Sequence, residues 1–112
     1  MKIINVSDAE SRKNPHGVDA RKLYDSEHAM ATHITLKPGE QLKRHITPVE
    51  VFFYVLEGKG IIEIGDETQE VEADTLIESP AKIPHCWYNK SDSELRVLVV
   101  KVPKPTESTR VL

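Results

Sequence analysis

Residues 39–58 read Gly-Glu-Gln-Leu-Lys-Arg-His-Ile-Thr-Pro-Val-Glu-Val-Phe-Phe-Tyr-Val-Leu-Glu-Gly, and this stretch decides how the chain is interpreted. Five residues separate Gly39 from His45, and an apolar run then leads to Gly58. Successive side chains of a β-strand point to opposite faces, so Val51, Phe53 and Val55 are predicted to share one face of a strand. The run therefore predicts a strand with one buried face, bounded by two glycine turns.

The rest of the chain repeats this pattern of short apolar segments separated by Gly, Pro, Asp and Ser. Apolar residues at helical spacing are hard to find, so the fold class is predicted to be all-β, a sandwich or a barrel. The turn at residues 37–40 has Pro38 to preset φ and Gly39 to allow a positive φ. The predicted strands are Ile3–Val6, Arg21–Tyr24, Ala29–Leu36, Gln41–Arg44, Val49–Leu56, Ile61–Ile64, Thr68–Val71, Thr75–Ile77, Cys86–Asn89 and Leu95–Val102.

A second segment, residues 80–89, carries Pro80, Lys82, His85 and Asn89 at separations of one, two and three residues. Together with residues 39–58, this spacing resembles the two sequence motifs of the cupin superfamily, and in particular its small single-domain members. The resemblance implies a double-stranded β-helix, the jelly-roll barrel of cupins. The length predicts one domain over residues 1–112, with a core of about 20–102. Polar composition predicts a loop at 7–17, and an extended tail is predicted at 103–112.

In metal-binding cupins, two histidines and a glutamate of the first motif and one histidine of the second bind the metal. Carried over by position, the resemblance implies that His45 and His85 are metal ligands here. Thr47 stands at the second histidine position and Val51 at the glutamate position. Two imidazoles need a third ligand to hold Zn, Ni, Mn, Fe or Cu tightly, and without one the metal is absent.

Glu50 is the candidate for that third ligand. If Val51 and Phe53 point into the barrel, the alternation of a strand sends Glu50 outward as a surface carboxylate. A β-bulge near Pro48 and Val49 would instead swing Glu50 into the site.

Other chemically active residues are assigned from their context. Trp87 shares parity with His85, so it is expected to line the pocket or to pack in the core, with Thr47, Val51 and Phe53 as further lining residues. Cys86 is expected to be a buried structural thiol. His33 is expected at a surface or an interface unless a bulge brings it to the site. Two histidines in loop contexts are expected to be solvated, namely His16 and His28.

Composition limits the kinds of partner that the protein is expected to bind. The net charge of −3 and the pI near 5.9 offer no electrostatic reason to bind nucleic acid or an anionic membrane. One cysteine excludes an intrachain disulfide. With no secretory signal and no apolar run long enough for a membrane span, a cytoplasmic protein is expected. An outward apolar set, Phe52, Tyr54 and Leu56, predicts a homodimer.

Two functions follow. The first is a cupin barrel that binds a small molecule in a mostly apolar central pocket, with His45, Thr47 and His85 as polar groups and with or without a divalent metal. The alternative is a metal-dependent enzyme of dioxygenase or isomerase type acting on a small polar substrate. The cupin fold hosts both classes of protein, so the choice depends on the site rather than on the fold.

Overall fold

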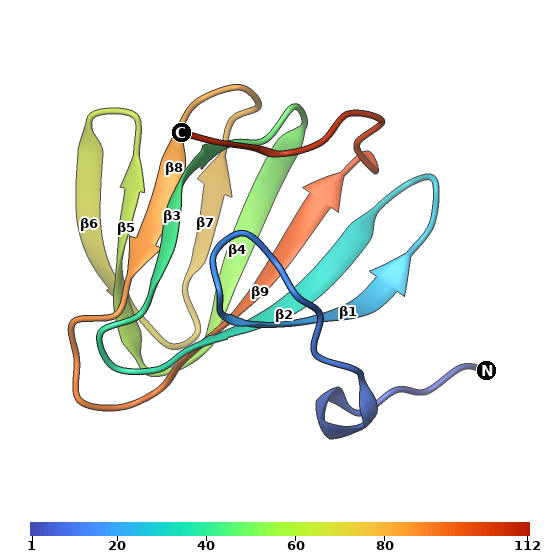
Figure 1. Ribbon diagram of the computed structural model, residues 1–112, viewed down its shortest axis with the longest axis horizontal. Coiled ribbons are helices and arrows are strands. Elements are labelled where there is room, and N and C mark those ends of the chain that lie inside the picture. The colour runs from blue at the N-terminus through green and yellow to red at the C-terminus, as the bar shows by residue number, and fades with distance from the viewer.

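The computed structural model describes all 112 residues as two five-stranded antiparallel sheets that face each other (Figure 1). The first sheet has the order β1-β2-β9-β4-β7 and the second the order β10-β3-β8-β5-β6. The elements are η1 (Val6–Asp8), β1 (Asp19–Asp25), β2 (Met30–Leu36), β3 (Gln41–Ile46), β4 (Glu50–Glu57), β5 (Lys59–Ile64), β6 (Glu67–Glu72), β7 (Leu76–Ser79), β8 (His85–Tyr88), β9 (Leu95–Val102) and β10 (Arg110–Val111). The predicted all-β fold class is confirmed.

The two ends of the chain differ from the prediction. No strand forms at residues 3–6, because this apolar segment has no neighbouring strand to pair with; Asn5 instead caps the 3₁₀ turn η1 by accepting a hydrogen bond from the N–H of Ser7. At the other end, the predicted extended tail contains the short strand β10. The C-terminal segment crosses one end of the barrel after β9, and β10 pairs with β3 through Val111 and His45 (Figure 1).

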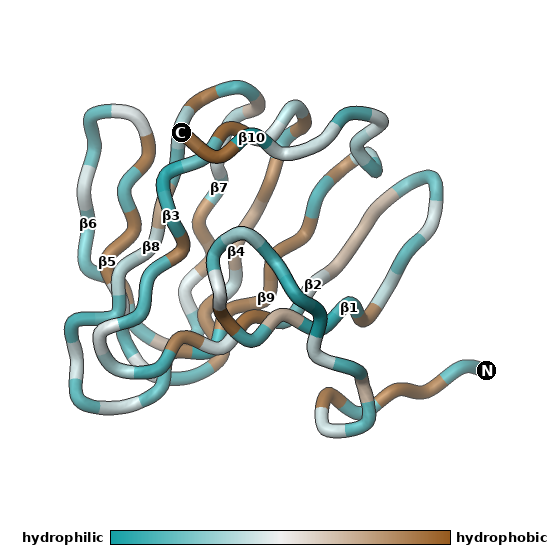
Figure 2. The backbone as a smooth tube through the Cα atoms, in the orientation of Figure 1, coloured by the Kyte–Doolittle hydropathy of each residue, from teal (hydrophilic) through white to brown (hydrophobic).

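The core lies between the sheets and follows the predicted alternation. Val51, Phe53 and Val55 of β4 are buried, whereas Phe52 and Tyr54 between them are half-buried on the outer face. The inward residues of both sheets form one apolar cluster: Val18, Ile34, Leu36, Leu42, Val51, Phe53, Val55, Ile62, Trp87, Leu95, Val97 and Val99. The edge strand β6 is mostly polar, which protects the edge of the sheet from pairing with another chain (Figure 2).

Asn89 of the second motif ties two turns together rather than contributing to a site. Its buried side-chain amide donates to the carbonyl oxygens of Leu36 and Ser93, each at 2.8 Å. Its Oδ1 accepts from the backbone N–H and the hydroxyl of Ser91. Because every polar atom of this buried amide has a partner, Asn89 stabilises the end of the barrel opposite the C-terminal segment.

Gly58 matches its motif position for a steric reason. Its φ is +80°, in the left-handed region, and a Cβ there would collide with the backbone carbonyl of Glu94. Only glycine fits both conditions. In this all-β chain, no helix is long or apolar enough to cross a lipid bilayer.

Candidate functional site

A cavity of about 200 Å³ lies between the two sheets, at the end of the barrel that the C-terminal segment crosses. Its walls are largely apolar and include Val18, Ile34, Val51, Phe53 and Val99. Polar and charged groups enter it from several segments: Asn14, His16, Thr32, His45, Thr47, His85, Lys101 and Thr109. The cavity combines an apolar wall with a few convergent polar groups, which is typical of a small-molecule site.

His45 and His85 meet because they lie directly opposite each other in the β3–β8 ladder. Their ring centroids are 4.4 Å apart, with the planes inclined by 67°. A register irregularity between Leu42 and His45 precedes this pair and aims His45 inward. The structure therefore brings together the two histidines that the motif spacing singled out.

The tautomer of His45 follows from its hydrogen bond. Its Nδ1 lies beside the carbonyl oxygen of Lys43, which can only accept, so Nδ1 carries the proton. The lone pair of the ring is then on Nε2, which has no hydrogen-bond partner in the protein. Burial lowers the pKa of His45, and the hydrogen bond to Lys43 opposes part of that shift. His45 is thus a neutral imidazole in the pocket with a basic nitrogen available.

His85 is held from both sides by hydroxyl groups. Its Nδ1 lies 2.7 Å from Oγ of Ser79, and its Nε2 lies 3.3 Å from Oγ1 of Thr47. Burial, followed by the proximity of His45, lowers the pKa of His85 to about 3. His85 is a neutral ring of fixed orientation across the physiological pH range.

His16 completes the histidine cluster, and its predicted solvated position is wrong. The loop before β1 folds over the pocket, so that the His16 ring lies 4.8 Å from that of His45. Its Nδ1 accepts a hydrogen bond of 2.9 Å from the backbone N–H of Lys43. Burial, followed by the proximity of His45, lowers the pKa of His16 to about 4. His28 is exposed, as predicted.

Lys101 is the only lysine, arginine or acidic residue that lines the cavity. It follows Val97 and Val99 on the inward face of β9, directly across the ladder from Val51. Its Nζ donates to Oγ1 of Thr109 at 3.2 Å. Burial lowers the pKa of Lys101, and the nearby charge of Lys22 lowers it further.

The remaining predicted site residues divide between two faces. Thr47, Val51 and Phe53 line the cavity. Glu50 is exposed and lines a separate hollow on the outer face of the first sheet, so no bulge brings it to the histidines. Trp87 is fully buried and is not among the residues that line the cavity; it packs in the core, with its ring centroid 5.5 Å from that of Phe53.

Two other assignments are settled by the same strand parity. Cys86 is a buried thiol, as expected, and its Sγ lies 3.3 Å from the hydroxyl of Tyr88. His33 faces away from the cavity, as its parity predicted. It is buried rather than exposed, and Nε of Arg96 donates a hydrogen bond to its Nε2 at 3.1 Å.

The donor set does not fit the metal centre that the resemblance implies. No three histidine, cysteine or acidic side chains converge so that they could hold an ion. The lone pair of His16 is used by Lys43, and both nitrogens of His85 have hydroxyl partners. His45 alone presents a nitrogen lone pair without a protein partner, and one imidazole is too few ligands for a tightly bound divalent ion.

Sequence reasoning missed His16, Lys101 and Thr109 as pocket residues. The alternation of β9 carried a usable signal for Lys101, since Val97 and Val99 predict that residue 101 faces inward. For His16 and Thr109 no such signal exists, because they lie in irregular segments whose position depends on docking against β3 and β9.

Comparison with known proteins agrees with the fold. The family model described as a cupin domain matches residues 32–101, more than half of the chain. The chain belongs to the cupin family. Among curated proteins, this cupin is 29% identical to polyketide synthase CurC of Streptomyces cyaneus over 94% of this chain and 73% of that protein. A small-molecule-binding or enzyme role is consistent with the family and the pocket together.

Two solved structures show the same barrel. The protein TT1209 of Thermus thermophilus superposes on this cupin with a TM-score of 0.80 and 28% identity, over 94% of this chain and all of that one. The polyketide cyclase RemF of Streptomyces resistomycificus superposes with a TM-score of 0.85, over all of this chain and 85% of that one. Its 24% identity makes this second likeness one of fold.

Proposed function

We propose that this cupin binds a small carbonyl compound in the cavity between its sheets, and that Nε2 of His45 accepts a proton from a carbon atom next to the carbonyl, which leaves an enolate, and then returns it. The observation that carries the proposal is the state of His45. Its Nδ1 proton is held by the carbonyl oxygen of Lys43, so its basic Nε2 is available in the pocket that it lines. A neutral imidazole placed in this way is a general base.

The dimensions of the cavity limit the ligand. A volume of about 200 Å³ is smaller than the roughly 300–1,000 Å³ of most ligand sites. A compound with one ring and a short side chain is the largest that we expect to fit. Apolar walls formed by residues such as Ile34, Val51 and Val99 favour an apolar body for this compound.

Proton transfer is the chemistry that the polar groups support. Thr47 and Ser79 orient His85, whose ring packs against His45 and limits its movement. The lowered pKa of His45 keeps it in the basic form at neutral pH. Similarity to a protein named as a polyketide synthase supports a substrate with two carbonyl groups separated by one carbon, because the hydrogens on that carbon are acidic.

The test uses 3-oxo-3-phenylpropanamide, a neutral dicarbonyl compound of suitable size. Proton NMR in D₂O measures the exchange of its C2 hydrogens with and without protein. We expect exchange to be accelerated at least ~10-fold over an equal concentration of free imidazole, in line with the roughly 10²–10⁴-fold typical of positioned bases. His45→Gln should abolish the acceleration, whereas His28→Gln, which changes an exposed histidine, should retain it.

A His45→Gln variant that exchanges the probe at the wild-type rate would show that His45 is not the base. Saturable binding of the probe in both proteins without any acceleration would reduce the proposal to a binding protein. Absence of binding at millimolar concentration would overturn the proposed function altogether.

We also propose that the barrel forms a homodimer through the outer face of its first sheet. Phe52 and Tyr54 of β4, Leu76 of β7 and Val102 of β9 share this face, and Leu76 and Val102 are 51% and 43% exposed. These apolar side chains share the face with Glu50 and Glu78, and such an apolar patch within a polar surround suits a symmetric contact. Light scattering after size exclusion should give twice the chain mass for the wild type and the monomer mass for Leu76→Asp. A wild-type monomer at ~50 μM would contradict this contact.

A further inference from the structure

Lys101 brings a cation into an otherwise apolar row. Leu95, Val97 and Val99 occupy the preceding inward positions of β9, and Lys101 continues the row into the cavity. Across the β4–β9 ladder it faces Val51, the residue at the motif position where metal-binding cupins have a glutamate. The position that could have supplied a carboxylate to balance this cation supplies an isopropyl group instead.

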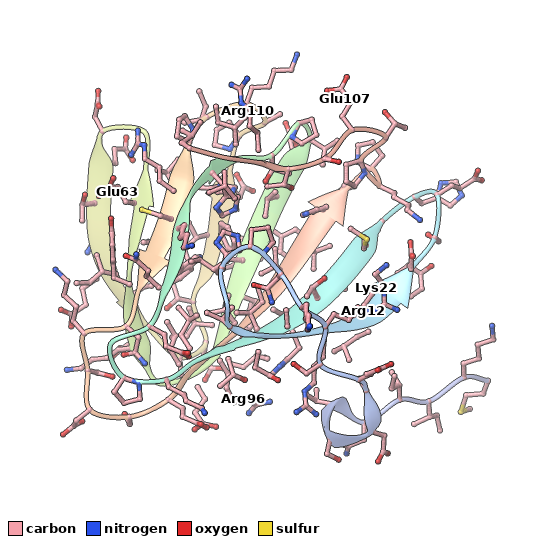
Figure 3. All side chains as sticks on the ribbon, in the orientation of Figure 1. Arg12, Lys22, Glu63, Arg96, Glu107 and Arg110 are labelled. Carbon is pink, nitrogen blue, oxygen red and sulfur yellow. The ribbon has the colours of Figure 1, made fainter.

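No acidic side chain lines the cavity. Among its 17 lining residues there is neither aspartate nor glutamate. The charged residues labelled at the periphery in Figure 3, such as Glu63, Glu107 and Arg110, likewise lie outside the cavity. The hydroxyl of Thr109 is the only side chain hydrogen-bonded to the Lys101 ammonium group, and it is neutral.

Two other lysines, unlike Lys101, have an acidic partner. Lys22 and Lys104 both pair with Asp25, at 3.2 Å and 2.7 Å. Asp25 is thereby engaged twice and does not line the cavity. Lys101 is left without a counter-ion, and an unpaired charge that is partly buried is unfavourable unless a ligand supplies the opposite charge.

We infer that the natural ligand carries a carboxylate and that the Lys101 ammonium group binds it, which makes a β-keto acid the substrate class of this pocket. The inference rests on the proposed function, because it names the ligand of the same site. A charge-assisted hydrogen bond from Lys101 would hold the acid group. His45 would then lie beside the carbon chain of the ligand.

The surrounding histidines strengthen the contrast between an acid and a neutral ligand. The Lys101 charge contributes to lowering the pKa of His16, His45 and His85, and burial is the larger cause in each case. The three rings are therefore neutral at pH 7 and neither repel nor attract an anion as full charges. Lys101 is therefore the group in the cavity that distinguishes a charged ligand from a neutral one.

The test compares two probes that differ only at one group: freshly dissolved 3-oxo-3-phenylpropanoate and its neutral amide, 3-oxo-3-phenylpropanamide. Calorimetry or NMR titration at pH 7 gives the Kd of each. For the wild type we expect the carboxylate to bind at least ~10-fold more tightly than the amide, as charge-assisted hydrogen bonds are about twice as strong as neutral ones. Lys101→Met should bring this ratio to about one without weakening the amide, and Lys104→Met should leave the ratio unchanged.

The wild-type ratio needs no variant, so the inference stays testable if Lys101→Met fails to fold. Equal Kd values for acid and amide would overturn the inference and leave the proposed pocket function standing. A preference for the acid that persists in folded Lys101→Met protein would also overturn it. If neither probe binds at millimolar concentration, the proposed function fails and the inference fails with it.

Discussion

The imidazole of His16 lies edge-on against that of His45, with 4.8 Å between the ring centroids. One residue, Lys43, orients both rings: its N–H donates to Nδ1 of His16, and its carbonyl oxygen accepts from Nδ1 of His45. The tautomers of two histidines are thus determined by one peptide segment of β3. With His85, they form a cluster of neutral rings, and this neutrality has consequences for stability.

The cluster predicts a loss of stability in acid. The folded-state pKa of His85 is about 3 and that of His16 about 4, both below the ordinary value of 6.5. Because the folded pKa is the lower one, the unfolded chain takes up these protons first. The stabilisation is complete above pH 6.5 and is lost as the pH falls toward the folded values. We expect the free energy of unfolding to fall by about 1.4 kcal/mol per pH unit for each such histidine.

Denaturant unfolding at pH 7.5, 6.0, 5.0 and 4.5 measures this slope. His85→Gln should reduce this slope by about 1.4 kcal/mol per pH unit, because one fewer proton is taken up on unfolding. His28→Gln, which changes an exposed side chain, should leave the slope as in the wild type. Identical slopes for His85→Gln and the wild type would contradict the lowered pKa of His85.

Metal should contribute little to the stability of this barrel. Since the lone pair on Nδ1 of His16 and both nitrogens of His85 are engaged in hydrogen bonds, we expect neither EDTA nor an equimolar amount of Zn²⁺ or Ni²⁺ to shift the Tm by more than about 1 °C. Differential scanning fluorimetry and elemental analysis of untagged protein check this. Stoichiometric metal that disappears in His45→Ala protein would contradict it and favour the metal-dependent enzyme.

Asn89→Ala should destabilise the fold by about 2–3 kcal/mol, because it removes two amide donors and leaves the carbonyl oxygens of Leu36 and Ser93 without these partners. The control is Asn5→Ala, which removes the exposed cap of η1 and should change stability by less than about 1 kcal/mol. Both are measured by urea unfolding. Similar losses for the two variants would argue against Asn89 as a tie between turns.

Gly58→Ala should be far more damaging than Gly39→Ala, although both glycines have a positive φ. Around Gly39 nothing lies within 4 Å of a new Cβ, so only the left-handed conformation is penalised, by about 1–2 kcal/mol. At Gly58 the Cβ would also meet the backbone of Glu94, and a loss above about 3 kcal/mol is expected. Equal midpoints of thermal unfolding for the two variants would contradict this contrast.

Lys101→Met should stabilise the free protein while weakening acid binding. It removes an unpaired cation whose pKa is lowered by burial, and it keeps a side chain of similar length among Val51 and Val99. We expect the Tm to rise by about 3–5 °C. Lys104→Met, which breaks a surface pair with Asp25, should give no rise. A lower Tm for Lys101→Met would mean that the cation stabilises the fold.

The local sequence pattern was enough to predict most strands of the barrel. The strand Leu95–Val102 has the bounds that its alternation predicted, and β4 buries Val51, Phe53 and Val55 as expected. The strand predicted at Ile3–Val6 does not form, because an apolar run becomes a strand only where a neighbouring strand can pair with it. The strand β10 was not predicted, because two residues are too few to show an alternating pattern and its partner β3 lies far away in the sequence.

The sequence by itself determined the all-β fold class and the inward face of β4, because these depend on alternation, and the spacing of the cupin motifs singled out His45 and His85. Only the tertiary structure decided the composition of the pocket. Docking of the loop against β3 brought His16 to His45, and the C-terminal segment brought Thr109 to Lys101. Such contacts depend on where irregular segments come to rest, and that position is determined by long-range hydrogen bonds that no local pattern encodes.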